Sequence, residues 1–555
     1  MALIEIREIM AEQLSSQTTA LGLAFLVLVW VLYSLKKNSK LPPGPTPWPI
    51  IGNLHHLGRL PHRNLYELSK KYGPVMFLRF GSLTCVVVSS SEMAKEFLKT
   101  HDLVFANRPC SAAGEHIAYN YKNLGMSSYG PYWRHMRKIC VMELLSAKRI
   151  ESFRFIREEE VSLAVRSAWE RSKQGNVAVN VSKTLLGITS TIIWRMLTGT
   201  IFSYDDVSGS GGELRDMVRE VTSTISAVNI GDFLPYIDWT ELQGIKKRMK
   251  KAHNFFDRIV ERIIDDHVEQ RKRALDENRE WTKDIVDVLL DVAESQTLEM
   301  EITRENIKAI IFVCHFHYYL LLSLFILFLN DFSMTLNQLI KCTTIYLPDL
   351  FIGGMETMAT TMEWAMTALI RYPLVAKKLQ EEIDSIVGKD RMVTESDLPN
   401  MDYLQCVVKE SLRLYLPGPL LLPHESSQAC SVGSQGYLIP AKTKLFVNAW
   451  AIARDPAVWE DAEEFKPERF MGNKTFDYQG QEFDMLPFGA GRRRCPGGHM
   501  AMGQMSLVMA QLWHCFDWKV EGNPADLDMT EEFGATVPRK FNLFAFPSLK
   551  LSTSF

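Results

Sequence analysis

A ten-residue stretch near the C-terminal end, residues 488–497 (FGAGRRRCPG), constrains this chain more than any other. It places Cys495 in a Gly/Pro-rich turn, after a run of arginines and before a helix-like run at 499–512. Glycines let the backbone approach a flat ligand closely, and the start of the next helix favours a thiolate. A thiolate with no second cysteine beside it suits one axial bond to haem iron, since a zinc site needs about four ligands. The plain alternative is a structural cysteine in a glycine turn.

Composition sets the class of protein. Apolar residues make up 46% and charged residues 23% of the 555 residues, which indicates a globular protein with a substantial core. The net charge of −3 gives no reason to expect a nucleic-acid partner. The nine cysteines include no CxxC pair, so neither a disulfide framework nor a zinc module is predicted.

The N-terminus predicts a membrane anchor. Residues 18–35 are uncharged and mostly apolar, near the minimum length for one membrane-spanning helix. Lysines follow at once, whereas residues 1–17 carry acidic side chains, so the positive-inside rule leaves 1–17 in the lumen. A cleaved signal peptide is the rival interpretation, but the acidic start does not fit it. Residues 36–50 are basic and then proline-rich, and we interpret them as a stiff hinge.

The remainder, 51–555, is predicted to be one domain that is mainly helical with a small β region. Residues 75–89 form two β-rich runs around Gly81 and Ser82, which favours a hairpin. The helical periodicity is clearest in four ranges: 91–99, 131–143, 154–174 and 246–278.

Two motifs carry paired donors or charges. Trp133 and Arg137 lie one helical turn apart, so an indole N–H and a guanidinium share a face and could both bind a haem propionate. Glu410 and Arg413 form an i,i+3 pair, which on an exposed helix would contribute little to stability. Taken alone, each motif is equally compatible with an ordinary helix surface.

A third motif, residues 353–357 (GGMET), precedes an amphipathic run at 359–370. Consecutive glycines within a helix cost about 1 kcal/mol each, which suggests that the helix opens a groove there. For Glu356 and Thr357 alone, a solvated helix face is the simpler interpretation.

Taken together and in order, these motifs resemble the cytochrome P450 family: W-x-x-x-R, G-G-x-E-T, E-x-x-R, P-E-R-F and F-x-x-G-x-R-x-C-x-G. Within the family the chain looks most like the plant A-type group. The resemblance implies a helical triangular prism with small β-sheets, haem b, and monooxygenation of a small molecule with O₂. It also implies electrons from NADPH–cytochrome P450 reductase and a single-pass position in the endoplasmic reticulum membrane, with the catalytic domain in the cytosol.

The resemblance also assigns roles to residues. Cys495 would ligate the iron, and Phe488 would pack near the thiolate. Glu356 and Thr357 would be the catalytic pair that delivers protons during O–O bond cleavage. The propionate-binding residues would be Trp133, Arg137, His424 and Arg493, and the structural triad would be Glu410, Arg413 and Arg469.

The substrate is expected to be an apolar or aromatic secondary metabolite of the phenylpropanoid, flavonoid or terpenoid type. The expected pocket segments are mostly apolar with a few hydroxyls: 107–125, 222–232, 351–357, 419–422 and 533–537. The alternatives are a haem-thiolate isomerase or dehydratase that does not use O₂, and a non-catalytic product.

The last alternative arises from an anomalous insertion, residues 313–348. It interrupts the predicted helix that starts near Thr303 and would otherwise continue into residue 349. It has no Gly, Ala, Glu, Arg or Trp, a bias typical of translated AT-rich noncoding sequence. We interpret it as a retained intron; a second membrane span is the rival, although its strongly apolar part is short for a bilayer.

Overall fold

The computed structural model describes residues 40–173, 177–200, 230–240, 243–277, 282–295, 302–311, 353–472, 480–532, 534 and 536–551. The predicted anchor (18–35) and the predicted insertion (313–348) lie outside these residues. Within the described part of the chain, no helix is both long and apolar enough to span a bilayer.

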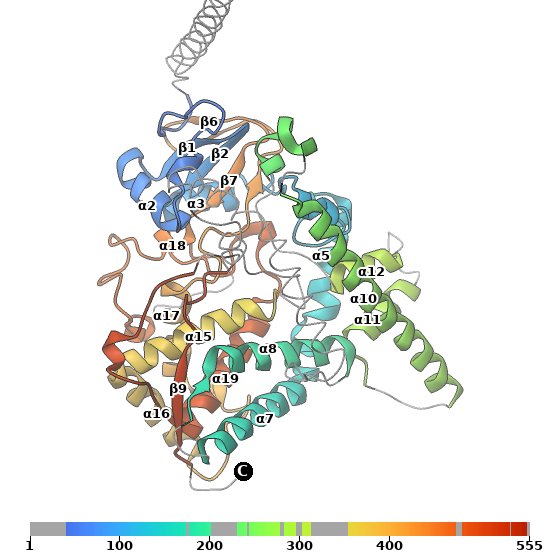
Figure 1. Ribbon diagram of the computed structural model, residues 1–555, viewed down its shortest axis with the longest axis vertical. Helices are drawn as coiled ribbons and strands as arrows, with labels where there is room; N and C mark the ends of the chain where they lie inside the picture. The colour runs from blue at the N-terminus through green and yellow to red at the C-terminus, as the bar shows by residue number, and fades with distance from the viewer. Residues whose placement is uncertain are drawn as a thin grey trace, which may run out of the picture.

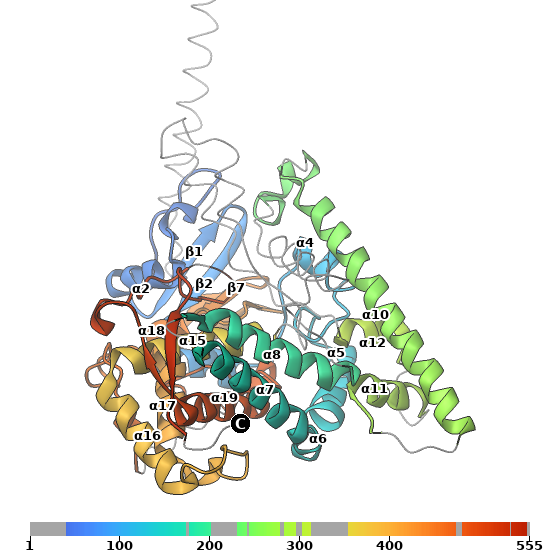
Figure 2. The ribbon, with the colours of Figure 1, turned by 60° about the horizontal axis from the view of Figure 1, so that its bottom comes forward.

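The described chain is mainly helical, with a small sheet region at one end (Figure 1). Figure 2 shows a roughly triangular molecule in which the long helix α10 runs along one edge. The helices are α2 (Pro61–Tyr72), α3 (Ser91–Lys95), α4 (Ala112–His116), α5 (Pro131–Ile139), α6 (Ala147–Ser152), α7 (Arg154–Lys173), α8 (Val181–Thr198), α10 (Ile245–Asp276), α11 (Ile285–Glu294), α12 (Arg304–Ile311), α15 (Glu356–Arg371), α16 (Pro373–Val387), α17 (Asp402–Leu414), α18 (Ala449–Ile452) and α19 (Gly498–Cys515). The predicted mainly α fold with small sheets is confirmed.

The largest sheet has the strand order β1-β2-β7-β4. The predicted hairpin forms its edge: β1 and β2 pair antiparallel with Val75 opposite Val88. Strand β7 then pairs parallel to β2, although it lies far along the chain. The strands are β1 (Val75–Phe80), β2 (Leu83–Val88), β3 (Val179–Asn180), β4 (His424–Glu425), β5 (Cys430–Val432), β6 (Tyr437–Ile439), β7 (Lys444–Val447), β8 (Phe516–Lys519) and β9 (Phe544–Leu549).

The helical core is built around two buried helices, α15 and α19. Nearly every residue of α19 is buried, as expected of a helix that is apolar on all sides. Helix α15 packs on α8, α17 and α19, so it lies at the centre of the helical region (Figure 1). The predicted helix near Thr303 is also present: Asn306 N–H donates to Thr303 Oγ1 at 3.3 Å, so Thr303 caps α12.

Candidate functional site

Cys495 lies in a tight loop just before helix α19. Its backbone N–H donates to the carbonyl of Phe488 at 2.9 Å, which closes the loop. Gly491 has φ of +67°, and a Cβ there would lie 2.1 Å from the carbonyl oxygen of Leu98, so only glycine fits. The loop therefore holds Cys495 exposed on the wall of a cavity, with Phe488 beside it.

The cavity has a volume of about 250 Å³. The loop around Cys495 and the start of α15, with Gly353 and Thr357, both contribute to its wall. The predicted proximal and distal motifs, more than a hundred residues apart in sequence, therefore meet at one cavity.

Four arginines, Arg108, Arg137, Arg493 and Arg494, contribute to the described wall of this cavity. No aspartate or glutamate is found among the described residues of its wall. Main-chain carbonyls fix the direction of the guanidinium groups of Arg108, Arg137 and Arg493. The acceptors are Ala106 for Arg493 Nε (2.7 Å), Pro423 for Arg108 Nη1 (2.7 Å) and Arg494 for Arg137 Nη2 (2.7 Å).

The positive charges of Arg108, Arg137 and Arg493 repel one another, so an anionic ligand in the cavity would stabilise them. Burial, together with the charges of Arg108 and Arg137, lowers the pKa of Arg493 to about 8. Burial likewise lowers the pKa of Arg137. A ligand that brings carboxylates would reverse this effect, because an opposite charge nearby favours the ionised guanidinium. The two propionates of haem, with Cys495 available for the iron, fit this donor set.

Two predicted propionate donors, Trp133 and His424, hydrogen-bond to main-chain carbonyls in this structure. The indole N–H of Trp133 donates to the carbonyl of Leu124 at 3.0 Å, and its ring lies 4.2 Å from the Arg493 guanidinium carbon. Trp133 therefore supports Arg493 by a cation–π contact. His424 Nδ1 donates to the carbonyl of Phe105 at 2.8 Å.

The protonation state of His424 follows from its surroundings. Burial, and then the charges of Arg108 and Arg493, hold the pKa of His424 well below its usual value. Because Nδ1 carries the proton, the neutral ring offers Nε2 as an acceptor. Donation to a propionate would require a second proton, which a bound carboxylate would favour.

The predicted triad forms a buried network. Glu410 and Arg413 have no exposed side-chain surface, and Arg413 Nε donates to Glu410 Oε2 at 2.7 Å. Arg469 Nε donates to the other carboxylate oxygen at 3.0 Å. Arg413 also donates to the carbonyls of Ala453 (2.8 Å) and Ala462 (2.7 Å). The network therefore ties α17 to the segment that precedes the cysteine loop.

The distal motif is a turn followed by the first residues of α15. Thr357 Oγ1 donates to the carbonyl of Gly353 at 2.6 Å, and Thr357 lines the cavity. Glu356, at the first position of α15, is half-buried and is not part of the described wall. Glu356 is therefore next to a wall residue in the sequence without being part of the described wall itself.

Four of the five predicted pocket segments contribute described residues to the wall. They do so through Arg108, Leu124, Gly125, Gly353, Gly354, Thr357, Leu421, Leu422 and Thr536. The fifth, 222–232, is described only from residue 230. Its Asp232 lines a second, polar cavity, together with Cys110 and Lys444.

The sequence analysis did not identify Arg108 as one of the arginines that line the cavity. The sequence contains one indication of this role: Arg108 is the only arginine of the predicted pocket segment 107–125. Three methionines of the wall, Met358, Met500 and Met505, were also not predicted.

The fold and the cavity together define a haem protein with a cysteine ligand. The family model described as cytochrome P450 matches residues 42–316 and 330–544. The chain therefore belongs to the cytochrome P450 family. The residues between the two matched stretches, 317–329, fall within the predicted insertion.

Plant proteins are among its most similar curated relatives. Cytochrome P450 750A1 of Pinus taeda is 48% identical over 536 residues, covering 95% of this chain and 94% of the relative. Phenylacetaldehyde oxime monooxygenase of Prunus mume is 38% identical, with 97% of each chain covered. A solved zebra fish cytochrome P450 with abiraterone shares the fold, with a TM-score of 0.68 and 22% identity, covering 89% of this chain and 100% of that structure.

These relatives make the chain a plant cytochrome P450 of the A-type. It is a haem-dependent monooxygenase, an oxidoreductase of the class linked to plant secondary metabolism.

Proposed function

We propose that this monooxygenase hydroxylates a small apolar or aromatic secondary metabolite of the phenylpropanoid, flavonoid or terpenoid type. The division of the cavity carries the proposal. Guanidinium groups and Cys495 occupy the part that suits haem, while leucines, methionines and the hydroxyls of Thr357, Thr361 and Thr536 line the remainder. An apolar wall with few polar groups favours a ligand that is held by shape and oriented by one or two hydrogen bonds.

The chain's own residues divide the work of holding the cofactor and handling protons. Bound haem supplies the iron at which O₂ is reduced and one oxygen atom is transferred. The Cys495 thiolate would bind that iron, and Arg108, Arg137 and Arg493 would neutralise the propionates of the haem.

Thr357 donates its hydroxyl proton to the carbonyl of Gly353, so the lone pairs of Oγ1 can accept a hydrogen bond from water. We infer that Glu356 passes protons to Thr357, which presents them inside the cavity. Both residues would act as one relay, because Glu356 itself does not line the described wall.

We further propose that NADPH–cytochrome P450 reductase supplies the electrons and that residues 18–35 anchor the chain in the endoplasmic reticulum membrane. Exposed apolar side chains near the start of the described chain support a membrane-facing end: Trp48 is 53% and Ile50 is 70% exposed. Trp239 is 83% exposed. It belongs to the segment 230–240, which contacts the β1–β2 hairpin, because Ser82 N–H donates to the carbonyl of Phe233 at 3.0 Å.

The test uses the holoenzyme. A thiolate-type carbon-monoxide difference spectrum establishes the cofactor, and a panel of apolar and phenolic metabolites is then screened for spectral displacement of water from the iron. Binding ligands are incubated with NADPH and reductase. A product that carries one oxygen from O₂ supports the proposal; rearranged product without O₂ uptake would show an isomerase instead.

We infer, finally, that residues 313–348 are a retained intron and not part of the catalytic domain. Sequencing the mature transcript across codons 312–349 tests this. The inference is wrong if every transcript carries the segment.

A further inference from the structure

Three threonines line the part of the cavity left for the substrate, and their hydroxyls differ in what they can still bind. Thr357 Oγ1 donates to the carbonyl of Gly353 at 2.6 Å, and Thr361 Oγ1 donates to the carbonyl of Thr357 at 2.9 Å. A hydroxyl has only one proton, so these two groups can offer a ligand only their lone pairs. Thr536 Oγ1 instead pairs with another hydroxyl, that of Thr360, at 3.2 Å.

Burial fixes the direction of this hydroxyl–hydroxyl bond. Thr360 is only 3% exposed, and within the described chain its hydroxyl has no hydrogen-bond partner other than Thr536. If Thr536 were the donor, the proton of Thr360 would be buried without an acceptor, which is unfavourable. Thr360 is therefore the donor, and the proton of Thr536 stays available on the cavity wall. Among the threonines of the described wall, Thr536 is the one that can donate to a ligand.

Trp364 fixes the turn that carries Thr536 and Val537, here called the tail turn. The indole N–H of Trp364 donates to the carbonyl of Val537 at 2.8 Å, and the N–H of Val537 donates to the carbonyl of Pro417 at 3.0 Å. Both main-chain polar groups of the residue after Thr536 are therefore held. The Trp364 ring is itself stacked on Tyr415, with ring centroids 4.9 Å apart and planes inclined by 3°.

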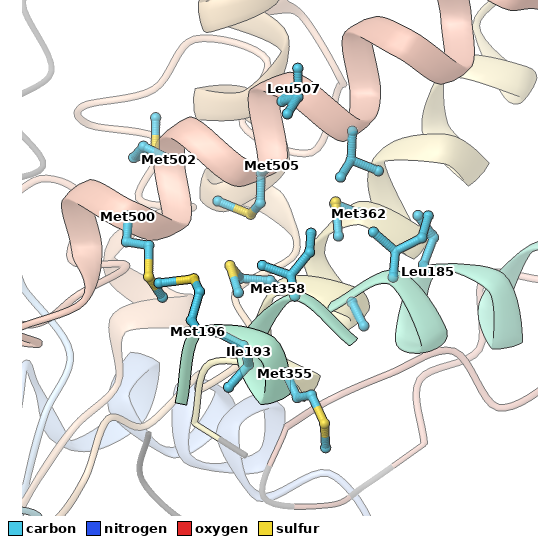
Figure 3. Close-up of a cluster of buried hydrophobic side chains, with 14 of the residues drawn as sticks. Leu185, Ile193, Met196, Met355, Met358, Met362, Met500, Met502, Met505 and Leu507 are labelled. Atoms are coloured by element: carbon cyan, nitrogen blue, oxygen red, sulfur yellow. The ribbon is translucent and has the colours of Figure 1, made fainter. Parts of the chain in front are cut away.

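Helix α15 contacts different neighbours along separate faces, since residues four apart share one face. The face that includes Thr357 lines the cavity. Met358 and Met362 lie between α8 and α19 (Figure 3). Thr360 and Trp364 contact the tail turn and are absent from the described wall. An effect of these two residues on a ligand must therefore pass through the tail turn.

We propose that Thr536 donates a hydrogen bond to an acceptor oxygen of the substrate, and that Thr360 and Trp364 are positioning residues that orient this hydroxyl. The inference rests on the proposed function, and it narrows the substrate to an apolar or aromatic molecule that carries a carbonyl or a hydroxyl group. A hydrocarbon of the same shape would leave the Thr536 proton without an acceptor in the cavity, so it should bind less well.

The test compares two probes of the same shape, benzophenone and 1,1-diphenylethylene, which differ in a carbonyl oxygen replaced by a CH₂ group. Equilibrium dialysis of the holoenzyme measures the dissociation constant of each probe, and the ratio of the two constants gives the ketone preference. Comparing this ratio between variants removes the difference in water solubility. Thr536→Val should lower the ketone preference by about three-fold or more. Thr361→Val, the matched control on the wall, can change both affinities but should leave their ratio unchanged. An unchanged ratio in Thr536→Val overturns the proposal.

Two further pairs of variants test the positioning residues. Trp364→Phe keeps the buried ring but removes its N–H, and it should lower the ketone preference. Trp518→Phe, its control, removes an N–H that donates to the carbonyl of Leu512 at 3.0 Å away from the described wall, and should not. Thr360→Val should also lower the preference, and Thr360→Ser, which restores the hydroxyl, should recover it. If Trp364→Phe binds no haem, the two Thr360 variants decide the question; an unchanged preference in Thr360→Val contradicts the positioning role.

The same measurements separate this inference from the proposed function. Failure of both probes to bind the wild type would contradict the proposed apolar or aromatic substrate, and this inference with it. Binding of both probes with the same ratio in the wild type and in every variant would leave the proposed substrate class intact and overturn the hydrogen bond from Thr536.

Discussion

Arg413 holds the carboxylate of Glu410 through two parallel hydrogen bonds, Nε to Oε2 at 2.7 Å and Nη2 to Oε1 at 2.8 Å, in an environment with no exposed side-chain surface. The same i,i+3 spacing occurs at Glu67 and Lys70, where both side chains are more than half exposed and the ions lie 2.7 Å apart. The two pairs differ mainly in burial, so they separate the cost of an unpaired buried charge from the value of a surface ion pair.

Glu410→Gln should destabilise the fold by about 3–5 kcal/mol, because it leaves the Arg413 guanidinium buried without its counter-ion. Glu67→Gln should change stability by less than about 1 kcal/mol. Denaturant unfolding followed by tryptophan fluorescence measures both, and the Soret band reports retained haem. Similar losses for the two variants would mean that burial does not set the value of the pair.

The arginines that line the cavity lead to a prediction about haem affinity. Arg493→Ala removes a guanidinium that lines the cavity and whose pKa burial lowers to about 8. Hydrogen bonds to charged groups contribute about 1.5–3 kcal/mol, so haem affinity should fall about 10- to 100-fold. Haem transfer to excess apomyoglobin measures the change.

The neighbouring residue provides the control. Arg492 is 43% exposed, pairs with Asp102 at 2.9 Å and is absent from the wall. Arg492→Ala should leave the transfer rate within about two-fold, since an exposed ion pair contributes at most about 1 kcal/mol. Equal effects of the two substitutions would contradict the assignment of Arg493 to the propionates.

A buried histidine on α10 predicts a pH effect away from the site. His267 Nε2 lies 2.7 Å from Asp284 Oδ2, and Nδ1 lies 2.6 Å from the carbonyl of Ile263. Each ring nitrogen therefore faces an acceptor, which favours the imidazolium form of His267. Burial by itself would lower the pKa of His267, but these bonds and the Asp284 charge raise it above its usual 6.5.

The sign of the pH dependence follows. Because the folded pKa lies above the unfolded one, the stabilisation is fully present below pH 6.5 and is lost as the pH rises through the folded pKa. The unfolding temperature of the wild type should therefore fall as the pH rises from 6.5 through the folded pKa of His267. In His267→Gln, the unfolding temperature should change less over this pH range. An unchanged profile in the variant would exclude His267 as its origin.

Thr357 allows a test of the proton relay. Thr357→Val removes the hydroxyl that lines the cavity, so more of the reduced O₂ should leave as hydrogen peroxide and less product should form per NADPH consumed. Thr367, ten residues further along α15, makes the same kind of contact, from Oγ1 to the carbonyl of Glu363 at 2.7 Å, but is not part of the described wall of the cavity. Thr367→Val should leave the ratio unchanged; an equal rise would point to helix destabilisation.

The parts of the site that short motifs encode were accessible from the sequence. The loop around Cys495 needs glycine at position 491 because the backbone of Leu98 approaches it, and a local pattern records that need. The pairing of Glu410 with Arg413 follows from helical spacing alone. Both features depend on residues that are close in the chain.

The remaining parts depend on contacts between distant segments. Arg108 faces the cavity because its guanidinium donates to carbonyls of residues 422 and 423, over three hundred positions away. The indole N–H of Trp133 donates to Leu124 because the preceding loop folds back over α5. Helical periodicity does not predict this fold of the loop. The methionines of α15 and α19 read as ordinary core residues until the two helices are brought together.

The predicted insertion makes the last prediction. Ile310, near the end of α12, and Gly353, just ahead of α15, line the same cavity, so the chain must bring these two positions together. The 36 residues of 313–348 (348 − 313 + 1) separate them, although the family resemblance would join residue 312 to 349 directly. Deleting 313–348 should raise the fraction of protein with a thiolate-type carbon-monoxide difference spectrum several-fold.

A variant in which a Gly/Ser chain of equal length replaces the segment separates the two physical causes, since closing a flexible loop of this length costs little. If the Gly/Ser variant incorporates as much haem as the deletion variant, the apolar sequence of the segment prevents haem incorporation. If it incorporates as little as the full-length chain, the interruption of the helix prevents it. A full-length protein with complete haem incorporation would contradict both.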